Sequence, residues 1–200
     1  MRVAIDGVDG AGKTILANEL VKPIASRGRQ VIRASIDGFH RPRAERYQHG
    51  ANSPTSYYYD SFNYLALRSV LLEPLGANGN RQYRPRIFDY RTDQPIAEPS
   101  AEAEHNAILL FDGVFLLRSE LNACWDYRIF VHANFEITVA RAVQRDQAHG
   151  GDASEIVRRY KNKYVPGQEL YLQSAHPQEL ANAIVENNDP LEPKLVLRNR

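Results

Sequence analysis

An eight-residue segment near the start of the chain constrains the fold more than any other feature. Residues 7–14 read Gly-Val-Asp-Gly-Ala-Gly-Lys-Thr, and they stand between the apolar run of residues 3–5 and a helical pattern that begins at Lys13. The three glycines let the backbone turn so that several N–H groups converge, and the following helix adds the positive end of its dipole. A strand, this G-x-x-x-x-G-K-T loop and a helix in succession predict a site for phosphate groups.

The loop also predicts what binds there. Lys13 would lie along the β- and γ-phosphates of a nucleoside triphosphate, and the Thr14 hydroxyl would ligate Mg²⁺. We therefore expect ATP and Mg²⁺ as cofactors, bound by Gly7, Asp9, Gly10, Ala11, Gly12, Lys13 and Thr14. The alternative is a glycine-rich turn without a ligand, but such a turn does not require Lys-Thr after the last glycine.

Composition is typical of one folded unit without a membrane segment. The 200 residues carry a net charge of only +1, so we expect a single domain over residues 1–200 and no bulk nucleic-acid binding. Cys124 is the sole cysteine, which excludes an internal disulfide and fits a reducing, cytoplasmic setting. The apolar run over residues 108–117 is too short to span a bilayer, and Met1 leaves no room for a signal peptide before the first apolar run. A homodimer is the common default for such a chain.

Apolar and helical stretches alternate along the chain, which predicts an α/β fold with three layers, α/β/α, around a mainly parallel sheet. The expected strands cover residues 3–6, 31–36, 108–111 and 127–131. The expected helices run from Lys13 to near Gly28 with a kink at Pro23, over residues 61–73, from about Phe135 to His149 after an Asn134 cap, and onward from an Asp152 cap. Residues 82–90 alternate loosely and could form one arm of a hairpin.

Acidic residues follow two of the expected strands. Asp37 follows the second strand and Asp112 follows the third. Because ligands bind beyond the carboxyl ends of parallel strands, both carboxylates should lie beside the phosphate loop. We interpret Asp37 as the general base for an acceptor hydroxyl, and Asp112 as a Mg²⁺ ligand, direct or through water. Each is followed by glycine, so a turn-forming Asp-Gly pair is the alternative for both.

Two arginines could supply the cations that phosphoryl transfer needs. Arg141 and Arg145 are four residues apart on an expected helix, so they project from the same face. They could close over a transferring phosphoryl group from a mobile lid, and a solvated helix face is the alternative. A GTPase is not favoured, because residues 162–165 read Asn-Lys-Tyr-Val and lack the aspartate that would read guanine.

In this order and at this spacing, the motifs resemble those of the uridine kinase and phosphoribulokinase family of phosphate-loop kinases, over residues 5–189. Residues 37–41, Asp-Gly-Phe-His-Arg, are similar to the family's segment that carries the base. Residues 111–115 are similar to its acidic-glycine motif for Mg²⁺, and residues 141–146 to its arginine-rich lid helix. The resemblance implies the phosphate-loop NTPase fold of nucleoside kinases, with a substrate-side hairpin, a small lid over about 141–165, and acceptor-binding insertions over about 38–60 and 80–95.

The resemblance also implies an acceptor site formed by His40, Arg41, Tyr57, Phe88 and Asp89. Tyr57 stands where the family has an aspartate for ribose hydroxyls, and no histidine follows residues 88–90 as it does in the family's hairpin segment. We expect an ATP- and Mg²⁺-dependent kinase whose partner is a small-molecule acceptor, with a nucleoside such as uridine or cytidine as the first candidate. Pantothenate, nicotinamide riboside, a sugar or a sugar phosphate are alternative acceptors. A nucleotide-binding regulator with slow ATP hydrolysis is the alternative class.

Overall fold

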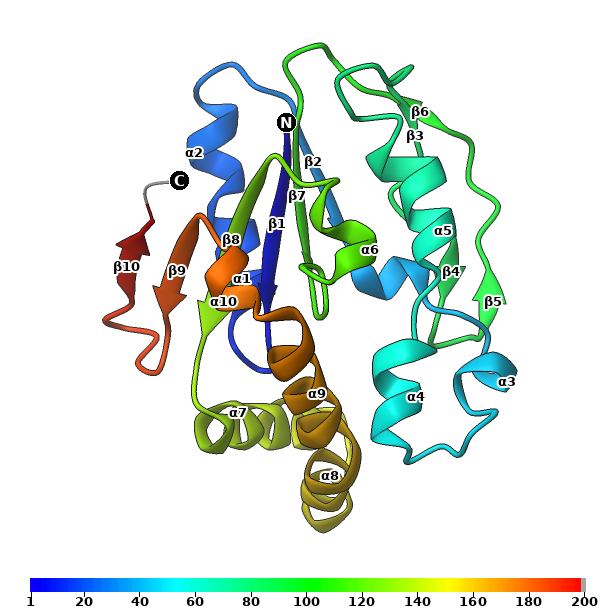
Figure 1. Cartoon of the computed structure of the whole chain (residues 1–200), viewed down its shortest axis with the longest axis vertical. Coiled ribbons are helices and arrows are strands. Elements are labelled where there is room, and N and C mark those ends of the chain that lie inside the picture. Colours follow the sequence, from blue (N-terminus) through cyan, green and yellow to red (C-terminus); the bar gives the residue numbers. More distant parts are fainter. Residues whose placement is uncertain (199–200) are drawn as a thin grey trace.

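The computed structural model describes residues 1–198, which form a central six-stranded sheet with helices on both faces (Figure 1). The strand order is β10-β9-β8-β1-β7-β2, and every neighbouring pair is parallel except β9 with β10. The strands of this sheet are β1 (Arg2–Gly7), β2 (Val31–Ser35), β7 (Ile108–Gly113), β8 (Tyr127–His132), β9 (Ala183–Glu186) and β10 (Lys194–Leu197).

Helices cover both faces of this sheet and extend beyond its lower edge in Figure 1, where α7 and α8 lie. They are α1 (Lys13–Glu19), α2 (Val21–Ala25), α6 (Ser119–Asn122), α7 (Phe135–Ala148), α8 (Ala153–Arg159), η3 (Tyr160–Tyr164), α9 (Val165–Ala175) and α10 (Pro177–Leu180).

Two hydrophobic cores lie on opposite faces of the sheet, because successive side chains of a strand point to opposite sides. On one face, Ile5 of β1 packs in a cluster with Ala17 of α1. On the other face, Ala4 packs in a cluster with Phe111 of β7 and Tyr171 of α9. The structure therefore confirms the expected three-layer α/β/α fold.

The long connection between β2 and β7 contains more regular structure than the sequence analysis predicted. The insertion over residues 38–60, for which no helix was predicted, contains two short helices, and the second starts at a Ser53 cap whose side chain accepts a hydrogen bond from Ser56 N at 3.1 Å. The segments of this connection are η1 (Ile36–Phe39), α3 (Arg43–Arg46), α4 (Pro54–Tyr59), α5 (Tyr64–Leu67), η2 (Arg68–Leu72), β3 (Gln82–Tyr83), β4 (Phe88–Asp89), β5 (Gln94–Pro95) and β6 (Ala101–Glu102). β4 pairs with β5 and β3 pairs with β6, so residues 82–90 supply the arms of two small antiparallel pairs.

Several helix boundaries follow from individual residues. Pro23 has no N–H to donate to the carbonyl four residues earlier, that of Glu19, and the first helix divides there into α1 and α2. Asp152 caps α8 as expected, since its carboxylate accepts from Glu155 N at 2.9 Å. Asn134 stands at the start of α7, but its side chain makes no capping hydrogen bond.

Two other expectations were wrong in detail, and two strands were not predicted. The helix predicted over 61–73 begins later, at Tyr64, after an Asn63 cap, and continues as the π-helical segment η2. The strand predicted over 31–36 ends at Ser35, because the chain turns into η1 there. The sequence analysis missed β9 and β10, two strands of four residues each at the edge of the sheet.

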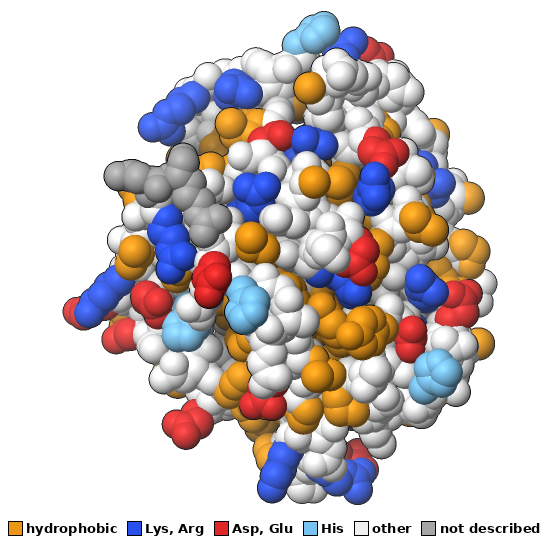
Figure 2. Space-filling model, viewed as in Figure 1, with side chains coloured by type: hydrophobic (Ala, Val, Ile, Leu, Met, Phe, Trp, Pro, Cys, Tyr) orange, Lys and Arg blue, Asp and Glu red, His pale blue; other side chains and the backbone are white. Residues whose placement is uncertain are grey.

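The surface of the described residues shows no single charged field on the face drawn in Figure 2, where basic and acidic side chains are interspersed. This agrees with the net charge of +1 for the whole chain. Hydrophobic side chains gather in the lower half of the same view. Within residues 1–198, no helix has the length and apolar character needed to cross a membrane.

Candidate active site

The phosphate loop after β1 has a backbone that only glycine fits at two positions. Gly10 and Gly12 have φ angles of +78° and +101°. A Cβ at Gly10 would lie 2.4 Å from the carbonyl oxygen of Thr138, and one at Gly12 would lie 2.5 Å from Asn187 Nδ2. Ala11 between them is fully buried, and its carbonyl oxygen accepts from Asn187 Nδ2 at 2.7 Å. The loop is therefore held against α7 and the segment after β9.

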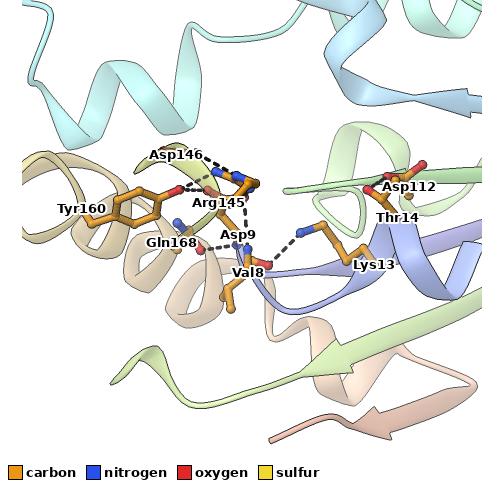
Figure 3. Close-up of polar contacts among 10 residues, drawn as sticks. Val8, Asp9, Lys13, Thr14, Asp112, Arg145, Asp146, Tyr160 and Gln168 are labelled. Carbon is orange, nitrogen blue, oxygen red and sulfur yellow. Dashed lines mark hydrogen bonds and ion pairs between the residues drawn. The ribbon is translucent and has the colours of Figure 1, made fainter. Parts of the chain in front are cut away.

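The two residues that follow the last glycine begin α1 and have different environments. Lys13 is buried and its Nζ donates to the carbonyl oxygen of Val8 at 2.7 Å, which folds the side chain back over the loop (Figure 3). Burial lowers the pKa of Lys13, while the charges of Asp9 and Asp6 act in the opposite direction. The ammonium group thus lies where phosphate oxygens could replace Val8 as its acceptor.

Thr14 contacts the carboxylate at the end of β7. Its hydroxyl donates to Asp112 Oδ2 at 2.6 Å, and Asp112 Oδ1 forms an ion pair with Arg33 at 2.8 Å. Arg33 comes from β2, which lies next to β7 in the sheet. A hydroxyl and a carboxylate oxygen side by side are the hard ligands that Mg²⁺ prefers. The chemistry of this pair therefore fits the metal that the loop sequence predicts.

A wide cavity of about 1000 Å³ opens beside the loop. Asp37 and Asp112 both line it together with Lys13 and Thr14, so the structure brings the two strand-end carboxylates to the phosphate loop. Asp37 lies in η1 directly after β2, with its side chain open to the cavity solvent. The surrounding walls remove much of the bulk water, and together with the charges of Asp9 and Asp112 they raise the pKa of Asp37 to about 6. A carboxylate with a pKa near 6 is ionised at neutral pH and is a better proton acceptor than an ordinary aspartate.

The two arginines of α7 have different surroundings. Arg145 lines the cavity, where its guanidinium contacts Asp9 at 3.3 Å and the Tyr160 hydroxyl at 3.0 Å. Arg141 instead donates to the carbonyl oxygens of residues 187 and 188 at 3.0 and 2.9 Å, and it does not line the cavity. The four-residue spacing therefore does not bring both arginines to the cavity.

Asp9 connects the phosphate loop to the helices beyond α7. The Tyr160 hydroxyl donates to its carboxylate, and its backbone N–H donates to Gln168 Oε1 at 2.7 Å (Figure 3). Burial alone would raise the pKa of Asp9, but the charges of Lys13 and Arg145 hold it below its ordinary value. Asp9 is therefore a stable anion that binds α7 and η3 to the loop.

Of the five predicted acceptor residues, the structure places two on the cavity wall. His40 and Tyr57 line it, whereas Arg41, Phe88 and Asp89 do not. Arg41 donates to the carbonyl oxygen of residue 62 at 3.1 Å, Phe88 is buried, and Asp89 accepts from the backbone of residue 91 at 2.9 Å in the β4–β5 turn. These three residues support the hairpin and its neighbours.

Burial keeps both cavity-lining residues of the predicted acceptor set, His40 and Tyr57, uncharged at neutral pH. Burial lowers the pKa of His40 to about 4, so the ring is neutral at pH 7. Its Nδ1 donates to the carbonyl oxygen of Asp37 at 3.0 Å, which leaves Nε2 as an acceptor. Burial also raises the pKa of Tyr57 well above its ordinary value, so its hydroxyl stays protonated.

The sequence analysis missed several residues that line the cavity or hold its walls. Arg43, Arg46, Tyr90, Arg91 and Tyr160 line it, and Arg33 and Gln168 support lining residues. The many arginines and tyrosines in residues 38–60 could have indicated that side chains of α3 line the cavity. Nothing in the sequence indicated that η3 and α9 would return to the loop, because that depends on how α7 and α8 pack.

A mainly parallel sheet, a phosphate loop after its first strand and carboxylates at the ends of two neighbouring strands define a phosphate-loop fold of the kinase type. The model of the Phosphoribulokinase / Uridine kinase family matches residues 3–186. The chain belongs to this family. It is accordingly an ATP-dependent kinase that acts on a small molecule.

Individual relatives agree with this assignment. A curated uridine kinase from Leuconostoc citreum (strain KM20) is 27% identical over 193 residues, covering 92% of this chain and 85% of its own. A solved structure of a "Possible Uridine Kinase" from Bacillus stearothermophilus superposes with a TM-score of 0.72 at 23% identity, covering 92% of this chain and 87% of its own. A "putative fructose transport system kinase" from Silicibacter sp. TM1040 also gives a TM-score of 0.72 at 23% identity, covering 88% and 85%. At this identity the two structures support the fold alone.

Proposed function

We propose that the cavity binds MgATP at the phosphate loop and transfers its γ-phosphoryl group to a hydroxyl of a small molecule bound beside Asp37. The observation that carries this proposal is that Asp37, with its raised pKa, lines the same cavity as Lys13 and Thr14. The loop amides and Lys13 would bind the donor phosphates. Thr14 and Asp112 would hold Mg²⁺, which supplies charge neutralisation at the phosphates when it is bound.

In the proposed reaction, the oxygen of the acceptor hydroxyl attacks the γ-phosphorus, and Asp37 accepts the proton of that hydroxyl. The bond from phosphorus to the bridging oxygen breaks, and ADP leaves with the electron pair. Lys13 and Arg145 lie on the same cavity and can neutralise the charge on the transferring group. Arg141 contacts the segment after β9 in this structure, so we propose a supporting role for it rather than a direct one.

Residues 141–165 would act as the lid. Arg145 of α7 and Tyr160 of η3 both contact Asp9 of the phosphate loop, so this region already closes against the donor site at one point. A bound γ-phosphate would compete with Asp9 for Arg145. Closure around the substrates would exclude water and limit wasteful hydrolysis.

For the acceptor, the curated relative and the sequence resemblance make a nucleoside such as uridine or cytidine the first candidate to test. The aromatic side chains of Phe62, Tyr90 and His40 support binding of a flat or apolar group, since the His40 ring lies 4.6 Å from Phe62 and 5.0 Å from Tyr90. Pantothenate, nicotinamide riboside, sugars and sugar phosphates are the alternatives to include.

The test is ADP release from Mg·ATP across these acceptors, with the mass of each product determined. We expect release to rise with one acceptor class and to yield a product heavier by one phosphoryl group. The Lys13→Ala variant serves as the control and should lose both ATP affinity and turnover. Slow ADP release that ignores every small alcohol and responds to a protein or nucleic acid would contradict the proposal and favour a regulator.

A further inference from the structure

Three arginines gather on the acceptor side of the cavity. Arg43 and Arg46 come from α3, and Arg91 comes from the turn between β4 and β5. These segments lie far apart in the sequence, yet the side chains of the three arginines line the same cavity as Asp37. A chain with a net charge of only +1 has thus concentrated cations where the acceptor would bind.

Few acidic side chains compensate these arginines. Asp93 forms an ion pair with Arg46 at 3.3 Å and also accepts from the backbone N–H of Arg43 at 2.9 Å. Within residues 1–198, no carboxylate lies within 4.0 Å of the guanidinium of Arg43 or of Arg91. Of the three guanidinium groups, only that of Arg46 is therefore paired with a carboxylate.

Arg46 in addition has an unsatisfied donor. Its side chain is only 11% exposed, and its Nε–H is buried with no hydrogen-bond partner in the described part of the chain. A buried guanidinium donor without a partner costs free energy, because it has lost its water. The Arg46 guanidinium therefore has one nitrogen paired with Asp93 and another, Nε, without an acceptor among the described residues.

The neighbourhood behind Arg46 is also positively charged. Lys163 of η3 is buried, with its ammonium group 4.7 Å from the centre of the Tyr47 ring. Burial and the charges of Arg46 and Arg159 lower the pKa of Lys163 to about 8. A neutral ligand would leave this repulsion in place, whereas an anion would relieve it.

We propose that the acceptor alcohol carries an anionic group, a carboxylate or a phosphate, which Arg43, Arg46 and Arg91 bind while its hydroxyl faces Asp37. This inference rests on the proposed kinase activity and narrows its substrate class. It disfavours neutral nucleosides such as uridine, which would leave Arg43 and Arg91 without an anionic partner and Arg46 with Asp93 alone. The donor phosphates would not need these arginines, since Lys13, Arg145 and the loop amides would bind them in the proposed reaction.

The first test compares matched acceptors that differ in charge: glycerate with glycerol, pantothenate with pantothenol, and ribulose 5-phosphate with ribulose. We expect the charged member of one pair to have the higher kcat/KM by at least about tenfold. A difference within the glycerate or pantothenate pair would indicate that the site binds a carboxylate, and a difference within the ribulose pair would indicate that it binds a phosphate. A neutral nucleoside or sugar that is phosphorylated more efficiently than every anionic acceptor would overturn the inference and leave the kinase activity intact.

The second test changes the arginines one at a time. Arg43→Gln and Arg91→Gln should each raise the KM for the preferred acceptor about tenfold, with the KM for ATP unchanged. Arg43 makes no side-chain ion pair within residues 1–198, so its replacement should not disturb folding. Arg27→Gln, an exposed arginine after α2, is the matched control and should change neither constant. An unchanged acceptor KM in both cavity variants would overturn the inference.

A binding measurement keeps the inference testable if no acceptor is turned over. The phosphate loop is first filled with Mg²⁺ and the non-hydrolysable analogue AMP-PNP, and glycerate, pantothenate and ribulose 5-phosphate are then titrated by calorimetry. We expect at least one of them to bind the loaded protein, and more weakly to the Arg43→Gln and Arg91→Gln variants. Absence of binding by all three anions, or equal binding to the variants, would contradict an anion site; a flat activity panel with intact binding would instead contradict the kinase proposal.

Discussion

Arg33 and Asp112 form a 2.8 Å ion pair between neighbouring parallel strands, and this pair presents the other carboxylate oxygen of Asp112 to the Thr14 hydroxyl at 2.6 Å. Asp112 is almost fully buried, so the arginine is the cation that makes its ionised form tolerable there. The carboxylate that we propose as a Mg²⁺ ligand is thus held in place by a residue from β2 that does not itself line the cavity.

This arrangement predicts strong coupling between the two residues. Arg33→Met would leave the buried carboxylate without its cation and should lower the free energy of unfolding by about 2 kcal/mol. The double variant Arg33→Met with Asp112→Asn should lose little more than the single variants, because the pair is already broken. A double-mutant cycle by urea unfolding checks this, and additive losses would show that the pair contributes nothing to stability.

A second buried carboxylate predicts a pH effect on stability. Asp6 of β1 is fully buried, accepts from the Tyr171 hydroxyl and accepts from Leu116 N at 3.2 Å. Burial raises its pKa from 3.8 to about 6. The folded state therefore holds this proton more tightly than the unfolded state, so the contribution of Asp6 is full below pH 3.8 and is lost as the pH rises to 6.

We expect Asp6→Asn to remove that dependence. Relative to Asp6→Asn, the wild-type protein should lose about 2 kcal/mol of unfolding free energy between pH 4 and pH 6.5, because the shift is about two pKa units and this range covers most of it. Unfolding by urea across this range measures the difference. A constant difference between the two proteins would contradict the raised pKa, and an NMR titration of the Asp6 carboxyl carbon gives a direct check.

The contact between Tyr160 and Asp9 predicts a change in lid dynamics. Tyr160→Phe would remove the hydrogen bond from η3 to the phosphate loop, a bond to a charged group that contributes about 2 kcal/mol. Backbone amides of residues 153–164 should then exchange with solvent about tenfold faster or more. Tyr59→Phe, at an exposed tyrosine, is the control and should leave exchange unchanged. Equal exchange in both variants would show that this bond does not hold the lid.

The fold was predictable wherever local sequence determines structure. The phosphate loop requires glycine at positions of positive φ, and β1, β7 and β8 each contain a run of at least three apolar residues, so these elements could be located from the sequence. The convergence of Asp37 and Asp112 on the loop followed from the geometry of parallel sheets.

The parts that could not be predicted depend on packing between distant segments. The direction of Arg141 depends on the carbonyl groups of residues 187 and 188, which belong to the turn after β9. Arg46 and Arg91 line the same cavity only because of how α3 packs against the β4–β5 turn. Helical spacing alone placed Arg141 and Arg145 on one face, and it could not show that a neighbouring turn would engage only the first.

The raised pKa of Asp37 predicts the pH profile of the kinase reaction. The base must be ionised to accept a proton, so kcat/KM for the acceptor should fall as the pH drops through about 6 and level off above pH 7. Binding of Mg·ADP in the same buffers separates this effect from loss of nucleotide binding. The profile of Asp6→Asn should retain the acid limb, because Asp6 does not line the cavity. A flat profile from pH 5 to pH 8 would be inconsistent with an Asp37 base.

Turnover of the Asp37→Asn variant with its best acceptor tests most directly whether Asp37 is the base, and it is measured beside Asp126→Asn, a matched change at a carboxylate that precedes β8 and lies outside the cavity. We expect Asp37→Asn to lower kcat by about 10²–10⁴ with ATP affinity nearly unchanged, whereas Asp126→Asn should stay close to the wild-type protein. Near-normal turnover of Asp37→Asn would contradict the account, because the carboxylate beside the phosphate loop would then have no part in moving the proton.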